Sequence, residues 1–266
     1  MTEETTEKRA RGIYLLPNLF TTAALFAGFY AIVAAMNGRF EAAPMAIFIA
    51  MVLDGLDGRV ARMTNTQSAF GAEYDSLSDM VSFGLAPALV IYSWSLDQLG
   101  KLGWLAAFIY AASAALRLAR FNTQIGIADK RYFQGLASPS AAAIVAGLVW
   151  VSHDAGFEGT EMRWVAFCLT VAAGLLMVSN VRYHSFKGLD LRGKVPFVAI
   201  LAVVLIFVTV AIDTPKVLFF GFLLYALSGP VMTIYLLRKR RGRHVDAVSE
   251  EQPEPVDETP ADSEQK

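Results

Sequence analysis

The stretch that decides the fold runs from Asp54 to Asp79 and reads DGLDGRVAR, then eight residues, then GAEYDSLSD. It contains four aspartates, and it lies between the strongly apolar run 42–53 and a second apolar run. Helical spacing of about 100° per residue places Asp54 and Asp57 on one face of the first segment. Asp75 and Asp79 are four residues apart and share a face of the second. The acids therefore lie on two matched helical faces at the ends of two predicted membrane helices.

These four acids predict a divalent-metal site. Each carboxylate at membrane depth costs roughly 2.5–3.5 kcal/mol, so four cost about 10–14 kcal/mol before any pairing. Arg59 and Arg62 cannot neutralise four acids and also leave room for a substrate, and Arg62 is placed to hold a phosphate. One divalent cation, or two, solves this problem, and oxygen ligands indicate Mg²⁺ or a similar hard ion rather than Zn²⁺. The alternative is a solvated acidic loop between two helices, but such a loop would not require the acids to lie on two matched helical faces.

The spacing of this stretch resembles the signature of the CDP-alcohol phosphatidyltransferase family. The matching positions are Asp54, Asp57, Gly58, Ala61, Arg62, Gly71, Asp75 and Asp79. The resemblance implies an enzyme that transfers a phosphatidyl group from CDP-diacylglycerol to an alcohol and releases CMP. It also implies a homodimer with two Mg²⁺ or Mn²⁺ ions.

The same resemblance implies a role for each residue of the signature. Asp79 is expected to be the catalytic base and also to touch the second metal. The expected metal ligands are Asp54, Asp57, Asp75 and Asp79. The residues expected to contact CDP-diacylglycerol are Gly58, Arg62 and Gly71.

Three further segments resemble the bacterial phosphatidylserine synthases of that family. They are DSLSDMVSFGLAP at 75–87, RLARFN at 117–122 and FQGLASPSAAA at 133–143. The last departs from the usual pattern twice, with Ala137 in place of a proline and Ser140 in place of an alanine, whereas Pro139 is kept. The resemblance favours L-serine as the acceptor, which would give phosphatidylserine. Glycerol 3-phosphate, which would give phosphatidylglycerophosphate, is the alternative.

The segment 117–122 supplies a second candidate site, for the acceptor or for a phosphate. Its members are Arg117, Arg120 and Asn122. Arg117 and Arg120 are three residues apart and share a helical face, so they could meet a substrate carboxylate or phosphate. The alternative is that the two arginines only anchor the end of a membrane helix.

The composition is that of a polytopic membrane protein. Of its 266 residues 55% are hydrophobic and 18% charged, and the mean hydropathy is +0.44, whereas soluble domains carry about 25% charged residues. We predict an all-α integral membrane protein with a bundle of about eight transmembrane helices. The predicted spans are 13–36, 42–62, 77–96, 103–120, 136–151, 163–180, 195–212 and 216–237.

The basic residues predict the topology. Counted on alternate sides of eight spans, 19 of the 23 Lys and Arg residues fall on one side, which indicates that both termini and the aspartates are cytoplasmic. The protein is then expected in the cytoplasmic (inner) membrane. We divide the chain into a cytoplasmic N-terminal tail at 1–12, a membrane domain at 13–241 and a disordered acidic cytoplasmic tail at 242–266.

Other functional classes receive little support. A transporter should show repeats or interrupted spans in matched halves, and we find neither. No P-loop or dinucleotide fingerprint supports ATP or NAD chemistry. The basic run 238–243 indicates a membrane edge rather than a nucleic-acid surface, so membrane lipids are the expected partners. The single Cys168 excludes a disulfide framework within the chain and a Cys-rich zinc site.

Overall fold

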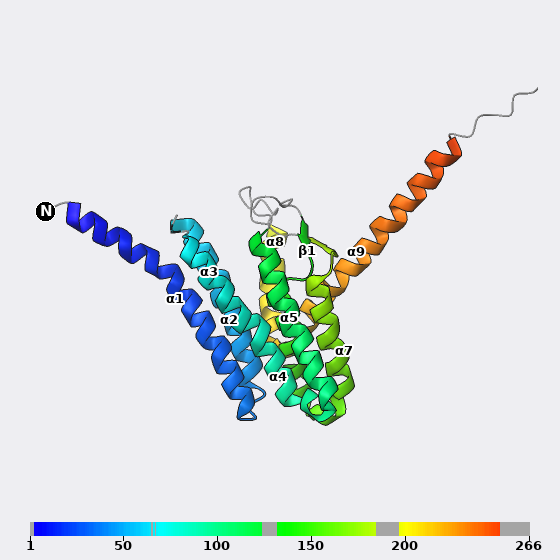
Figure 1. The fold of residues 1–266 in the computed structure, drawn as a ribbon, viewed down its shortest axis with the longest axis horizontal. Helices are drawn as coiled ribbons and strands as arrows, with labels where there is room; N and C mark the ends of the chain where they lie inside the picture. The colour runs from blue at the N-terminus through cyan, green and yellow to red at the C-terminus, as the bar shows by residue number, and fades with distance from the viewer. Residues whose placement is uncertain (1–2, 65, 67, 124–131, 185–196, 251–266) are drawn as a thin grey trace, which may run out of the picture.

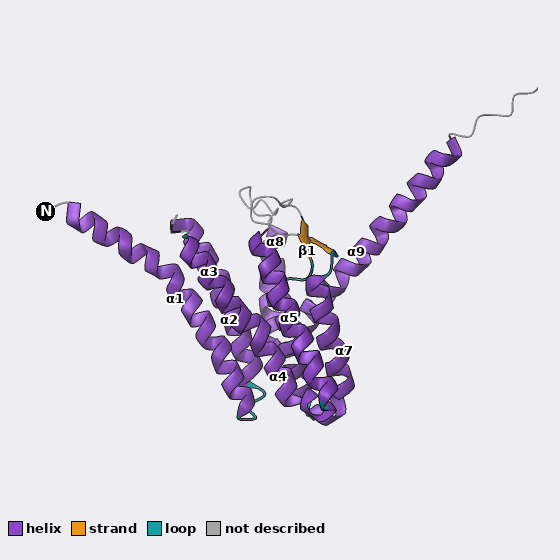
Figure 2. Ribbon diagram, in the orientation of Figure 1, coloured by secondary structure: helices purple, strands orange, loops and turns teal. Residues whose placement is uncertain are grey.

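The computed structural model describes residues 3–64, 66, 68–123, 132–184 and 197–250. These residues form a helical bundle with one short two-stranded ribbon (Figure 2). The helices are α1 (Glu3–Met36), α2 (Ala42–Thr64), α3 (Ala69–Asp79), η1 (Met80–Leu85), α4 (Ala86–Trp94), η2 (Leu96–Leu99), α5 (Lys101–Thr123), α6 (Ser138–Asp154), α7 (Gly159–Val178), α8 (Phe197–Ile212) and α9 (Thr214–Glu250). The ribbon pairs β1 (Tyr132–Gln134) antiparallel with β2 (Arg182–His184).

Each of the eight predicted apolar segments coincides with a helical segment in the described part of the chain, which confirms the all-α prediction. The third, predicted at 77–96, is part of a longer helical segment that runs through α3, η1 and α4. Within the described residues, five segments are long and apolar enough to cross a membrane, so the protein is a multi-pass membrane protein. They are Leu16–Met36, Ala69–Trp94, Lys101–Thr123, Gly159–Val178 and Thr214–Thr233. Eight crossings remain a prediction, because α2 carries the charges of the signature and α6 and α8 have only 17 and 16 residues.

The two predicted tails are helical where the structure describes them. Helix α1 begins at Glu3, inside the predicted tail 1–12, and α9 continues to Glu250, beyond the predicted membrane domain. The rest of the acidic tail, 251–266, lies outside the described residues.

Both ends of the described chain lie at one end of the bundle (Figure 1). The connection from α2 to α3 and the β1–β2 ribbon lie at this same end, whereas the turns from α1 to α2, from α4 to α5 and from α6 to α7 lie at the opposite end. The described segments that the topology assigns to one side are therefore at one end of the molecule. Which side of the membrane this end faces stays a prediction.

Local sequence explains where several helices begin. The Ser68 hydroxyl accepts a hydrogen bond of 3.0 Å from the Gly71 amide and caps α3. Glu158 and Glu161 form a capping box at the start of α7. Pro139 lies in the first turn of α6, where its missing N–H costs nothing.

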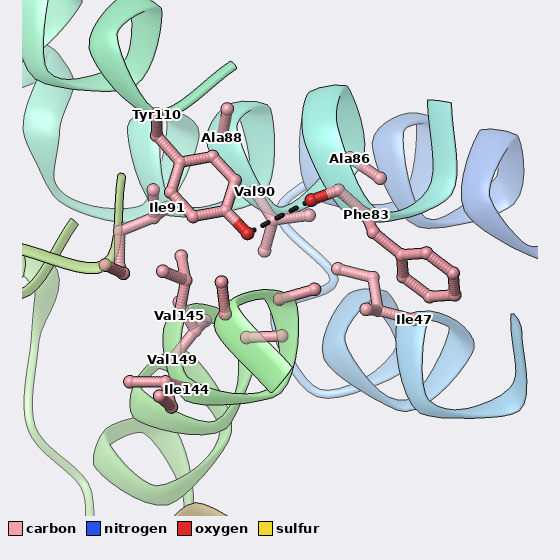
Figure 3. Packing of buried hydrophobic residues seen from close by; sticks show 14 of the residues in the cluster. Ile47, Phe83, Ala86, Ala88, Val90, Ile91, Tyr110, Ile144, Val145 and Val149 are labelled. Carbon is pink, nitrogen blue, oxygen red and sulfur yellow. Dashed lines mark hydrogen bonds between the residues drawn. The ribbon is translucent and has the colours of Figure 1, made fainter. Parts of the chain in front are cut away.

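Helix α6 is the buried centre of the bundle. Every residue from 140 to 150 is buried, and α6 packs against α2, α4, α7 and α9. The run 141–143 consists of alanines, whose small side chains let neighbouring backbones come close. Figure 3 shows Val145 and Val149 of α6 facing Tyr110 of α5 and the apolar side chains of α4.

A π-helical turn, η1, follows directly after Asp79. The fully buried Tyr110 donates a hydrogen bond of 3.0 Å from its hydroxyl to the carbonyl of Phe83 in this turn (Figure 3). A π turn shifts the helical ladder by one residue and is common at functional sites. Here it changes the register between Asp79 and the apolar helix α4 that follows.

Tyr183 of β2 fastens the ribbon to α9. Its hydroxyl donates a hydrogen bond of 3.0 Å to the carbonyl of Ala226. Pro230 lies four residues after Ala226 and has no N–H, so the helix itself leaves this carbonyl without its usual donor. Gly229 permits the approach, because a Cβ there would lie 2.4 Å from the Tyr183 ring.

Candidate active site

Three of the four predicted acids converge from two helices. Asp54 and Asp57 lie on α2 and Asp75 lies on α3, and one carboxylate oxygen from each is within 4.8 Å of the others. Three carboxylates at this separation could hold one cation. The helical faces predicted from the sequence therefore do meet.

Asp79 belongs to the cluster but occupies a different place in it. It lies one helical turn after Asp75 on α3 and does not complete the close triad. Its carboxyl group instead interacts with that of Asp54. Three acids thus lie within reach of one ion, and the fourth, Asp79, interacts electrostatically with Asp54 and Asp75.

The negative charge of the cluster has no ion pair. In the described part of the chain, the one ion pair joins Lys216 to Asp213. Among the same residues, Asp75 Oδ1 is buried and accepts no hydrogen bond. A buried carboxylate oxygen without a partner is costly, and an all-aspartate donor set is the kind that Mg²⁺ and Mn²⁺ prefer. The site therefore fits a hard divalent cation.

Helix α1 supports the cluster through Thr21. The buried Thr21 hydroxyl lies 2.7 Å from Asp57 Oδ2, to which it donates, and Asp57 is itself buried. The Ser78 hydroxyl on α3 donates to the Thr21 carbonyl at 3.1 Å, so one residue of α1 touches both acid-bearing helices. Sequence analysis missed Thr21, although a polar residue within the apolar span 13–36 was the available signal.

The three residues predicted to contact CDP-diacylglycerol lie on the two acid-bearing helices. A Cβ added at Gly58 would meet no described atom within 4 Å, so packing among the described residues does not require glycine there. Arg62 is exposed. A Cβ at Gly71 would lie 3.1 Å from the Ser68 hydroxyl and 3.5 Å from Asn18 Oδ1. Gly58 therefore leaves open space beside Asp57, as a site for a close ligand would require.

The three residues of the second candidate site have different hydrogen-bond partners in the structure. Arg120 donates to the carbonyls of Gln134 at 3.0 Å and Val178 at 3.1 Å, so it joins the end of α7 to the ribbon. Asn122 instead donates to the Ser76 hydroxyl at 3.0 Å, on the residue next to Asp75.

Arg117 differs from both of these residues. It donates to the Ser138 hydroxyl at 2.7 Å and interacts electrostatically with Asp79. Of the two arginines on this helical face, Arg117 is thus the one that the structure couples to the acid cluster.

Comparison with known proteins agrees with this geometry. Residues 14–176 match the family profile described as CDP-alcohol phosphatidyltransferase. A Helicobacter pylori protein named CDP-diacylglycerol–serine O-phosphatidyltransferase is 38% identical over 229 residues, which cover 85% of this chain and 94% of the relative. A protein of the same name from Mycobacterium bovis is 35% identical over 79% of this chain and 75% of its own length. Another, from Methanocaldococcus jannaschii, is 35% identical over 71% of this chain and 82% of its own length. The chain therefore belongs to the CDP-alcohol phosphatidyltransferase family.

Proposed function

We propose that the protein transfers the phosphatidyl group of CDP-diacylglycerol to the hydroxyl of L-serine, giving phosphatidylserine and CMP. The observation that carries the proposal is the convergence of Asp54, Asp57 and Asp75, with Asp75 Oδ1 buried and unpartnered among the described residues. Such a site needs a divalent cation, and so does a donor with a charged pyrophosphate. The names of the relatives support serine as the acceptor.

Asp54, Asp57 and Asp75 would hold Mg²⁺ or Mn²⁺, and Asp79 would contribute to a second ion. When bound, the ions neutralise the pyrophosphate and stabilise the negative charge on departing CMP. Thr21 keeps Asp57 in its orientation. Gly58, Arg62 and Gly71 would contact the CDP group, where the open space at Gly58 admits the ligand and the Arg62 guanidinium faces phosphate.

Asp79 would act as the general base. The serine hydroxyl oxygen attacks the phosphorus that carries diacylglycerol, and a new P–O bond forms. The P–O bond to CMP breaks, CMP leaves with that electron pair, and the hydroxyl proton passes to Asp79. Support for this role comes from the position of Asp79 outside the close triad, since a carboxylate that is less committed to metal is freer to accept a proton.

The proposal also includes the membrane location of the protein, its substrates and its oligomeric state. The described segments that the count of basic residues assigns to one side lie at one end of the bundle (Figure 1), which supports a protein of the cytoplasmic membrane whose termini and active site face the cytoplasm. The substrates are then CDP-diacylglycerol from the bilayer and L-serine from the cytoplasm. A homodimer, as the family resemblance implies, is part of the proposal.

The test is CMP release by the purified protein in detergent with CDP-diacylglycerol. L-serine should support release, and glycerol 3-phosphate should support little. Faster release with glycerol 3-phosphate would favour the alternative acceptor. EDTA should abolish release, and Mg²⁺ or Mn²⁺ should restore it. Full activity after exhaustive chelation would contradict the metal site.

A further inference from the structure

Arg117 is a half-buried cation with a hydrogen-bond donor that has no partner among the described residues. One terminal nitrogen donates to the Ser138 hydroxyl at 2.7 Å, and Nε is buried without a hydrogen-bond partner in the described part of the chain. A guanidinium has five N–H donors in a rigid fork. A buried N–H without an acceptor is costly, so a ligand that supplies anionic oxygens would relieve it.

Arg117 and the proposed base influence each other without being paired among the described residues. Arg117 and Asp79 interact electrostatically, but no ion pair between them is formed in the described structure. L-Serine carries its carboxylate and its hydroxyl on adjacent carbon atoms. A molecule of this shape could place its carboxylate on Arg117 and its hydroxyl toward Asp79.

Arg117 is also held from two other elements. Ser138, its hydrogen-bond partner, is fully buried at the start of α6. Tyr225 of α9 lies close enough to interact electrostatically with Arg117. The Tyr225 ring in turn packs against Tyr183, with ring centroids 5.5 Å apart. A surface anchor at a helix end would not need such support, whereas a specificity residue does.

We propose that Arg117, positioned by Ser138, selects an acceptor that bears a carboxylate, whereas Arg120 only holds the ribbon and α7 together. The inference rests on the proposed function and adds the residue that makes the site choose serine over alcohols without a carboxylate. Ser138 is a positioning residue, since it acts through Arg117.

The experiment compares L-serine with ethanolamine, which is serine without its carboxylate. For each variant, kcat/KM for both acceptors is measured by CMP release, and the ratio of the two is the readout. Damage to the fold or to the base affects both acceptors and cancels in the ratio. Arg117→Gln should lower the serine-to-ethanolamine ratio by about 10- to 100-fold, as expected for losing a charge-assisted hydrogen bond. The KM for CDP-diacylglycerol should stay near that of the unaltered protein.

Three further variants complete the test. Arg117→Lys keeps the positive charge but loses the planar, forked arrangement of N–H donors, so it should also lower the serine-to-ethanolamine ratio. Ser138→Ala should lower it by a smaller factor, mainly through a higher KM for serine. Arg120→Gln is the matched control, and should leave the ratio unchanged even if it reduces stability.

Two results would overturn the inference while leaving the proposed function intact. An unchanged ratio in Arg117→Gln would make Arg117 only a counter-charge for Asp79. A raised KM for CDP-diacylglycerol with an unchanged KM for serine would assign Arg117 to the donor phosphate. If the unaltered protein released no CMP with serine but did so with another alcohol, the proposed function itself would be wrong.

Discussion

The Thr21 hydroxyl on α1 donates a hydrogen bond of 2.7 Å to Asp57 Oδ2 on α2, and the two residues are 36 positions apart in the chain. Both side chains are buried. Partners in the shell around a metal site orient its ligands and tune their affinity. Helix α1 therefore supports the acid cluster, although it carries none of the signature residues.

Thr21→Val keeps the shape of the side chain and removes the donor. Asp57 would lose its fixed orientation, so the Mg²⁺ concentration for half-maximal CMP release should rise by about 10- to 100-fold. Thr21→Ser keeps the hydroxyl and should stay near the original value. A titration with Mg²⁺ at saturating substrates checks both variants. An unchanged Mg²⁺ requirement in Thr21→Val would show that the hydrogen bond serves only the packing of α1.

Asp54→Asn and Asp79→Asn should respond differently to added metal. Asp54→Asn removes charge from the close triad, so it weakens metal binding and high Mg²⁺ should rescue part of the activity. Asp79→Asn cannot accept a proton and should lose about 10²- to 10⁴-fold in rate, with no rescue. The measurement is rate against Mg²⁺ for both variants, with donor binding measured in parallel. Equal rescue of the two would make Asp79 another ligand.

Gly28 of α1 lies against Ser82 of η1. A Cβ at Gly28 would lie 2.7 Å from the Ser82 Cα, and backbone cannot yield as a side chain can. Gly28→Ala should therefore push α1 away from the acid-bearing helices and reduce stability by about 1–3 kcal/mol. It should also raise the Mg²⁺ requirement, because Thr21 lies on the same helix.

The control for Gly28 is another helical glycine. Gly221→Ala on α9 would meet no described atom within 4 Å, and should be neutral or slightly stabilising. Thermal unfolding in detergent compares the two variants. A Gly28→Ala protein as stable as Gly221→Ala would mean that the crossing between α1 and η1 is loose.

The predicted topology can be tested with single cysteines in a Cys168→Ala background. Gln98 lies in η2 and Ala69 opens α3, and both are exposed. A cysteine at Gln98 should react with an impermeant thiol reagent added outside intact cells, and one at Ala69 should react only after the cells are opened. The reverse pattern would place the acids on the outer face and separate them from cytoplasmic serine.

The sequence by itself determined which apolar segments are helical and which acids form the cluster. Apolar runs and helical periodicity are local properties, so each of the eight predicted apolar runs coincides with a helical segment, but they did not predict that α1 and α9 extend into the two predicted tails. The spacing within residues 54–79 predicted which acids share a face. It also predicted that the two faces would meet, because charges at membrane depth must find partners.

Only the tertiary structure decided which contacts each candidate site residue makes. Arg117 and Arg120 look equivalent at helical spacing, yet one reaches Ser138 and the other reaches the backbone of β1 and α7. Asp79 stands apart from the close triad, and Thr21 reaches the site from a distant segment. Each of these differences depends on which helix packs beside which and how closely. Such contacts arise from the packing of small residues such as Gly28 and the alanines of α6, and the spacing along a single helix carries no information about them.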